Sequence, residues 1–129
     1  MAAAKGTLPM APSGRNYESP PWCYLLWGVP AAMIFAGDAA YRGSYISPTL
    51  AGSTWALSVL WIGAGCFLNG RSCGRIHCII DGLAMPVLSV VGLLDAFSLV
   101  SLSWNYFWAV FFIVLTVSFV PELVWKRYA

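Results

Sequence analysis

The chain has 129 residues, of which 60% are hydrophobic and only 9% are charged, and its formal net charge is +2. Soluble domains carry about 25% charged residues, so the composition excludes an ordinary water-soluble domain. The charge is low and no basic stretch is interleaved with aromatic residues, which excludes nucleic acid as a partner. The composition predicts an all-α integral membrane protein with a single membrane domain.

Four apolar segments are each long enough to cross a bilayer, which needs roughly 20 residues per helix. Residues 1–21, rich in proline, precede them and are expected to form a cytoplasmic N-terminal tail. Short breaks separate the segments, so we expect an antiparallel up-down bundle of four transmembrane helices with short loops within residues 22–129. The expected spans are residues 22–41, 49–68, 78–100 and 104–121.

Arginine and lysine residues predict how the bundle is oriented. Of the seven, only Arg42 follows the first span; the other six precede the first span, lie between the second and third, or follow the fourth. Cytoplasmic segments carry an excess of these residues, so we expect a multi-pass protein of the cell membrane with both termini and the turn at residues 69–77 cytoplasmic. The six are Lys5, Arg15, Arg71, Arg75, Lys126 and Arg127.

Small residues recur at every fourth position of the first span and form a flat stripe. Such stripes let helix backbones approach closely in lipid, where packing replaces the hydrophobic effect. The stripe predicts a helix-packing face, either within this chain or against another transmembrane subunit. Membrane lipids and other transmembrane subunits are therefore the expected partners. The stripe consists of Gly28, Ala32, Ala36 and Ala40.

The turn between the second and third spans collects thiols, the only histidine and a carboxylate, which are ligands for transition metals. If the third helix begins at Cys73, then Cys73, His77 and Asp81 follow at intervals of four and share one helix face. Cys23 begins the first span at the same membrane level and can complete a ligand shell. Copper, zinc or mercury fit such donors. The predicted metal ligands are Cys66, Cys73, His77, Cys78 and Asp81.

The alternative interpretation of these residues is a packed turn at the membrane interface. Cysteine is a small residue that lipid tolerates, and His77 then bonds a backbone carbonyl. Arg71 and Arg75 hold lipid phosphates or contact a partner. Asp81 lies about one turn inside the apolar zone and needs a partner, with Arg75 or His77 nearest in the sequence. Composition and spacing leave both interpretations open.

Residues 69–78 read Asn-Gly-Arg-Ser-Cys-Gly-Arg-Ile-His-Cys. This run resembles the Asn-x-x-x-Cys-Gly-Arg-x-His-Cys signature of a poorly characterised group of small multi-span prokaryotic membrane proteins. The likeness covers residues 50–95 and implies a shared cytoplasmic turn. The layout is similar to that of small heavy-metal uptake proteins, although the adjacent cysteine pair typical of mercuric transporters is missing. The positions that carry the resemblance are Cys73, Gly74, Arg75, His77, Cys78 and Gly82.

The central turns of the four spans are apolar, and the sequence has no Ser/His/Asp arrangement, phosphate loop or carboxylate pair. We therefore expect no catalytic residues and no enzyme. The favoured function is an accessory subunit of a larger membrane complex whose Cys/His turn binds copper or zinc. One alternative is a small metal-handling or metal-uptake protein for copper, zinc or mercury. Another is a thiol-disulfide oxidoreductase, which this chain resembles in span count but without a Cys-x-x-Cys pair.

Overall fold

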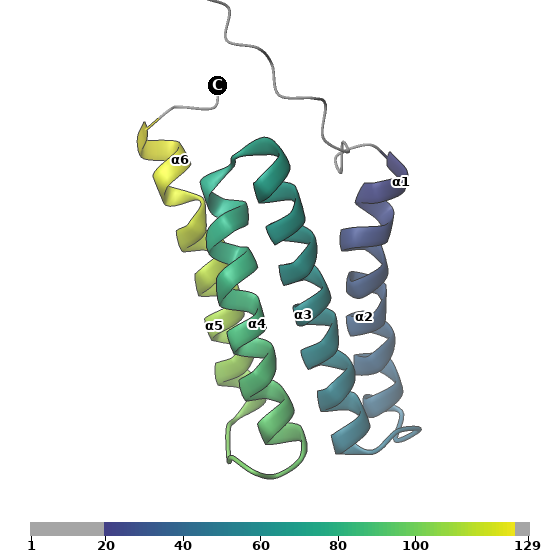
Figure 1. Ribbon diagram of the computed structural model, residues 1–129. Helices are drawn as coiled ribbons and strands as arrows, with labels where there is room; N and C mark the ends of the chain where they lie inside the picture. Colours follow the sequence, from purple (N-terminus) through teal and green to yellow (C-terminus); the bar gives the residue numbers. More distant parts are fainter. Residues whose placement is uncertain (1–19, 126–129) are drawn as a thin grey trace, which may run out of the picture.

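The computed structural model describes residues 20–125, and only the backbone of residues 20, 73, 122 and 125. This range is all-helical, which confirms the predicted class (Figure 1). Residues 1–19 of the predicted tail lie outside the described residues. The helices are α1 (Pro20–Cys23), the π-helix η1 (Tyr24–Gly28), α2 (Val29–Arg42), α3 (Pro48–Cys73), α4 (Ile76–Ala96), α5 (Trp104–Ser118) and α6 (Val120–Trp125).

Three helical stretches are long and apolar enough to cross a membrane: Pro21–Arg42, Pro48–Ser72 and Ile76–Ala96. The fourth apolar helix, Trp104–Ser118, is shorter, with 15 residues. These lengths fit the membrane class that the composition predicts.

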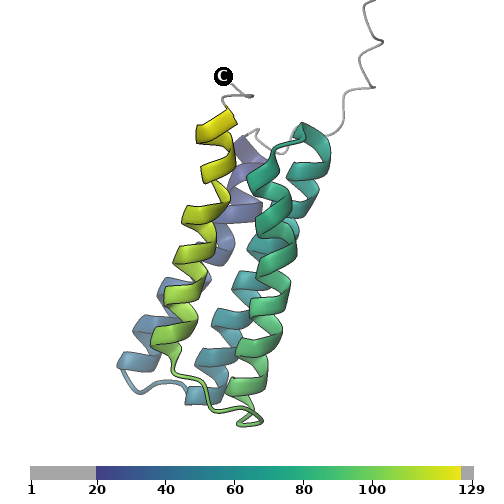
Figure 2. The same ribbon diagram turned by 90° about the vertical axis from the view of Figure 1, so that its left-hand side faces the viewer.

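The long helices run alongside one another, alternately up and down, in both views (Figures 1 and 2). The beginning of α1, the end of α6 and the connection between α3 and α4 lie at one end of the bundle, which we call the α3–α4 end. The connections from α2 to α3 and from α4 to α5 lie at the other end. Neighbours in the chain are neighbours in space, since α2 packs on α3, α3 on α4 and α4 on α5.

Helices α3 and α4 make the most extensive contact because small residues let their backbones approach. A Cβ atom on Gly82 would lie 2.8 Å from the backbone nitrogen of Phe67. Near the centre of the pair, Ser89 donates a buried hydrogen bond from its Oγ to the Ala56 carbonyl, at 2.7 Å. The two helices therefore form one unit, against which α2 and α5 pack.

A two-residue connection sets the antiparallel arrangement of α3 and α4. Gly74 has φ 70°, a left-handed conformation that favours glycine, and its N–H donates to the Gly70 carbonyl at 2.8 Å. At the other end of α3, Ser47 accepts a hydrogen bond from the Leu50 N–H at 3.2 Å, and Pro48 occupies the first turn.

The predicted break at Asn69-Gly70 is not a helix end, since α3 continues to Cys73. Both residues are buried against α4, so packing outweighs the cost of glycine in a helix, about 1 kcal/mol. Cys73 therefore closes α3, whereas His77 belongs to α4. The predicted stripe of Cys73, His77 and Asp81 on one helix is wrong.

Two other predicted ends also shift. Helix α4 ends at Ala96 rather than at residue 100, and the Asp95 carboxylate then accepts the Leu102 N–H at 2.7 Å and ties down the connection to α5. The chain is helical again beyond the predicted end at Pro121, which lies in the first turn of α6. Proline is tolerated there because no earlier carbonyl of that helix needs the N–H that proline lacks.

The first helix changes its pitch before Pro30. Proline has no N–H for the carbonyl of Leu26 four residues earlier, and the preceding turn is the π-helix η1. Cys23 at the end of α1 and Trp27 within η1 both line a cavity at the α3–α4 end. The core of the bundle centres on Val59, Met85, Phe107 and Phe111, and Phe111 also lines that cavity.

The close contact between α3 and α4 predicts the effect of a single methyl group. Gly82→Ala places a Cβ against the backbone of Phe67 at 2.8 Å, so we expect a loss of about 1–3 kcal/mol in the free energy of unfolding. Reversible unfolding by a denaturing detergent in mixed micelles measures it. Gly28→Ala is the control, because its Cβ would meet only the Tyr24 side chain at 3.8 Å. Equal stability of the two variants would contradict the assigned contact.

Candidate functional site

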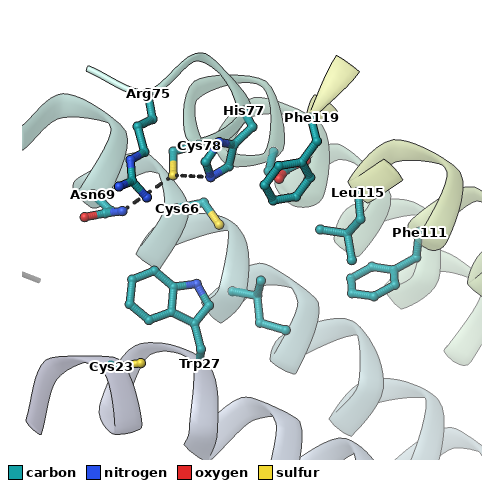
Figure 3. A pocket seen from close by; sticks show the side chains of 12 residues that line it. Cys23, Trp27, Cys66, Asn69, Arg75, His77, Cys78, Phe111, Leu115 and Phe119 are labelled. Atoms are coloured by element: carbon teal, nitrogen blue, oxygen red, sulfur yellow. Dashed lines mark hydrogen bonds between the residues drawn. The ribbon is translucent and has the colours of Figure 1, made fainter. Parts of the chain in front are cut away.

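A cavity of about 520 Å³ lies at the α3–α4 end, between the beginning of the first helix, α3, α4 and α5 (Figure 3). Exposed Cys23 lines it, so the cavity is open to the surroundings. Its size and mostly apolar walls are those of small-molecule sites. The lining residues are Cys23, Trp27, Ile62, Cys66, Asn69, Arg75, His77, Cys78, Asp81, Phe111, Leu115 and Phe119.

Two buried thiols face each other across the contact between α3 and α4. Cys66 is 6% exposed and Cys78 is 3% exposed, and their side chains are in hydrogen-bonding contact. Cys66 also contacts Trp27 of η1. Both are free thiols. The sequence separates the pair by eleven residues, and the two-residue turn at Gly74-Arg75 brings the helices together so that the thiols meet.

An imidazole and an amide complete the surroundings of the Cys78 sulfur. His77 Nε2 lies 3.2 Å from Cys78 Sγ, and Asn69 donates from Nδ2 to the same sulfur at 3.5 Å (Figure 3). The His77 ring stacks on Phe119, with ring centroids 4.3 Å apart and planes 21° apart. Three helical segments therefore hold this imidazole and thiol in place.

Asp81 lies one turn further into the bundle and is 1% exposed. Ser118 of α5 donates from its Oγ to Asp81 Oδ2 at 3.1 Å, and the same hydroxyl also lies 2.8 Å from the Leu115 carbonyl. Asp81 Oδ1 is buried without a hydrogen-bond partner. The sequence predicts Arg75 or His77 as the partner of Asp81. The hydrogen bond described here comes from a serine of the last long helix, and His77 interacts with Asp81 electrostatically.

The other predicted site residues have different outcomes. The Cys73 side chain lies outside the described part of the chain. Arg71 and Arg75 are exposed at the α3–α4 end, where the Arg71 guanidinium carbon lies 5.7 Å from the centre of the Phe67 ring. Within the described residues, no group of three or more His, Cys, Asp or Glu side chains is placed to hold a metal ion. The predicted five-ligand set is thus brought together only in part, as the pair Cys66 and Cys78 with His77 beside it.

Four residues of this site carry no role that the sequence predicts. Asn69 was present in the signature, and its burial at 5% explains why a helix accepts it. Trp27, Ser118 and Phe119 come from the first and last helices, and their distance along the chain hides their contact with the turn. In an antiparallel bundle, Ser118 and Asp81 lie at the same membrane level. This shared level is the one feature of the sequence that indicates their contact.

Comparison with known protein families, curated proteins and solved structures finds no match. The resemblance of residues 69–78 to a membrane-protein signature therefore stays a prediction.

The Ser118–Asp81 hydrogen bond predicts a specific loss of stability. Ser118→Ala removes the donor and leaves both carboxylate oxygens buried without a partner, so the free energy of unfolding should fall by about 1–3 kcal/mol. Thr116→Ala is the matched control, because exposed Thr116 bonds only the Phe112 carbonyl of its own helix and should change stability by less than about 0.5 kcal/mol. Mixed-micelle unfolding measures both. If the Ser118→Ala protein were as stable as the control, Ser118 would not be the hydrogen-bond partner of Asp81.

Proposed function

We propose that this chain is a four-span protein of the cell membrane with both termini and the α3–α4 end on the cytoplasmic side. The three helices of spanning length support this arrangement, and α5 extended by α6 supplies the fourth crossing. Arg71 and Arg75 at the α3–α4 end, against Arg42 at the other end, agree with the positive-inside rule.

The function that the geometry favours is the binding of a soft metal ion, with monovalent copper as the best fit, at the Cys66–Cys78 pair. The observation that supports this proposal is the hydrogen-bonding contact of two buried thiols from neighbouring helices at the wall of an open cavity. Thiolates select copper(I) over harder ions, and two sulfurs suffice for the linear coordination that this ion accepts. Rigid helices on both sides hold the donors close together before the metal arrives.

The proposal also accounts for the position of His77. Copper(I) binding replaces the protons of both thiols. The Cys66 proton is released to the solution, and the imidazole that takes the other proton lies 3.2 Å from the Cys78 sulfur. With its own proton on Nδ1, His77 accepts the Cys78 proton at Nε2. The resulting imidazolium offsets part of the negative charge that two thiolates and one monovalent ion carry together. No covalent or redox step is required, so the chain acts without catalysis.

This function predicts one copper(I) ion per chain in protein purified without oxygen, measured by competition with a coloured copper(I) chelator. Cys66→Ser and Cys78→Ser should each weaken binding at least tenfold, because a hydroxyl replaces a soft donor. Cys23→Ser is the matched control; it removes a thiol from the same cavity outside the pair and should keep the stoichiometry.

Two results would contradict the assignment. If only a Cys73→Ser variant lost binding, the metal site would lie at the turn between α3 and α4 and not at the Cys66–Cys78 pair. A Cys66–Cys78 disulfide that forms instead of copper binding would favour thiol-disulfide exchange, since the same contact brings both sulfurs within reach of each other.

A second function, compatible with the first, is that of an accessory subunit in a larger membrane complex. The small-residue stripe on the first helix supports it, because Gly28, Ala32 and Ala36 are exposed and Ala40 is half-buried. The buried side of this helix is formed instead by Leu26, Pro30 and Gly37. A stripe that points away from its own bundle is available to a helix of another subunit.

The accessory role predicts that the protein leaves its native membrane in mild detergent as a particle larger than one chain. Ala36→Leu keeps the face apolar for lipid but fills the stripe, so it should shift the particle toward the monomer in light-scattering chromatography. Val87→Leu is the control, because Val87 is 65% exposed on α4 and lies off the stripe. A wild-type monomer, or equal assembly of both variants, would exclude this use of the stripe.

A further inference from the structure

The proposed copper site uses the thiol side of the cavity and leaves its carboxylate unexplained. Asp81 lines the cavity, is 1% exposed, and has one oxygen bonded to Ser118 and one without a partner. A buried polar atom without a partner is costly and rare, and an ionisable residue within a membrane helix generally marks a functional site. The unpartnered oxygen therefore indicates a positively charged or hydrogen-bond-donating ligand that belongs in the cavity.

The walls around Asp81 indicate what kind of ligand this is. Phe111, Leu115 and Phe119 form the α5 side of the cavity, and Trp27 and Ile62 line it from the first helix and α3 (Figure 3). Aromatic rings attract cations over their faces, and the attraction grows when water is excluded. A single anionic group in an aromatic cavity of about 520 Å³ suits a large monovalent cation whose charge is spread out, because such an ion loses little hydration when it leaves water.

We propose that this cavity binds a lipophilic organic cation, with the Asp81 carboxylate as its counter-charge and the α5 aromatic side chains as its walls. The proposal goes beyond metal binding and concerns the carboxylate of the cavity, not its thiols. Ser118 positions Asp81 by bonding one carboxylate oxygen, and the other is buried without a partner, so the negative charge acts on the cation from within the cavity wall.

Besides three cysteines, two side chains that can carry a positive charge, Arg75 and His77, line the cavity and are compatible with this ligand. Ser118 holds Asp81 against α5. Arg75 lies beside Asn69 and Cys78, on the side away from Leu115 and Phe111 (Figure 3). His77 is stacked on Phe119, whereas Trp27 and Phe111 line the cavity outside this stack. The cation therefore lies toward α5, at a distance from the guanidinium.

Equilibrium dialysis of tetraphenylphosphonium against the purified protein in micelles tests the proposal, with empty micelles subtracted. We expect one ion per chain, and at least tenfold weaker binding for Asp81→Asn, which keeps the shape and removes the charge. Asp38→Asn is the matched control. It also removes one carboxylate, but from an ion pair with Arg42 outside this cavity, and it should bind as the wild type does. Triphenylphosphine oxide, a neutral compound of similar shape, should not compete.

Two outcomes would overturn the site: unchanged binding by Asp81→Asn, or equal binding of the neutral compound. A measurement on the wild type covers the case in which Asp81→Asn does not fold. Dicyclohexylcarbodiimide modifies carboxyl groups in apolar surroundings, and bound tetraphenylphosphonium should slow the modification of Asp81 at least fivefold, as followed by mass spectrometry. Modification at the same rate with and without the cation would also exclude the site. Copper binding is tested with the thiol variants and cation binding with the Asp81 variant. Failure of one proposal therefore leaves the other untouched.

Discussion

The close contact of α3 and α4 is the interaction on which the rest of this structure depends. Glycines occupy positions where a side chain would collide with the facing helix, for example Gly82 against the backbone of Phe67 and Gly63 against Met85. In a membrane, helices gain no hydrophobic free energy by leaving lipid for each other, so close packing and buried hydrogen bonds must hold them together. The Ser89–Ala56 hydrogen bond supplies one of these. The same contact brings Cys66 to Cys78.

The polar groups of the cavity differ in how many hydrogen-bond partners they have. The Cys78 sulfur has an imidazole and an amide beside it, and the neighbouring thiol as well. Asp81 has one donor for two oxygens. The two cysteines and the carboxylate are therefore chemically different groups of one cavity, with Cys78 and Asp81 one turn apart on α4.

The sequence predicts the break after the second span at Asn69-Gly70, whereas in the structure the helix end lies at Gly74. Gly74 is a helix end because it adopts a left-handed conformation that other residues avoid. Asn69 and Gly70 carry the same kind of signal but lie inside α3, since burial against α4 and the bond to Cys78 outweigh their weak helix propensity. Because the helix ends four residues later than Asn69-Gly70 suggests, Cys73 and His77 fall on separate helices.

The sequence by itself determined the all-helical class and the gathering of cysteines and the histidine near one turn. It predicts four spans, of which three are helices of membrane-spanning length in the structure. These features follow from runs of apolar residues and from neighbours in the chain. Only the tertiary structure decided that Cys66 pairs with Cys78, that Ser118 is the partner of Asp81 and that the stripe of the first helix faces outward. Such pairings join residues far apart in the chain, and the rotation of each helix about its axis depends on how its neighbours pack against it. In a helix that is apolar on every side, no hydrophobic face indicates that rotation in advance.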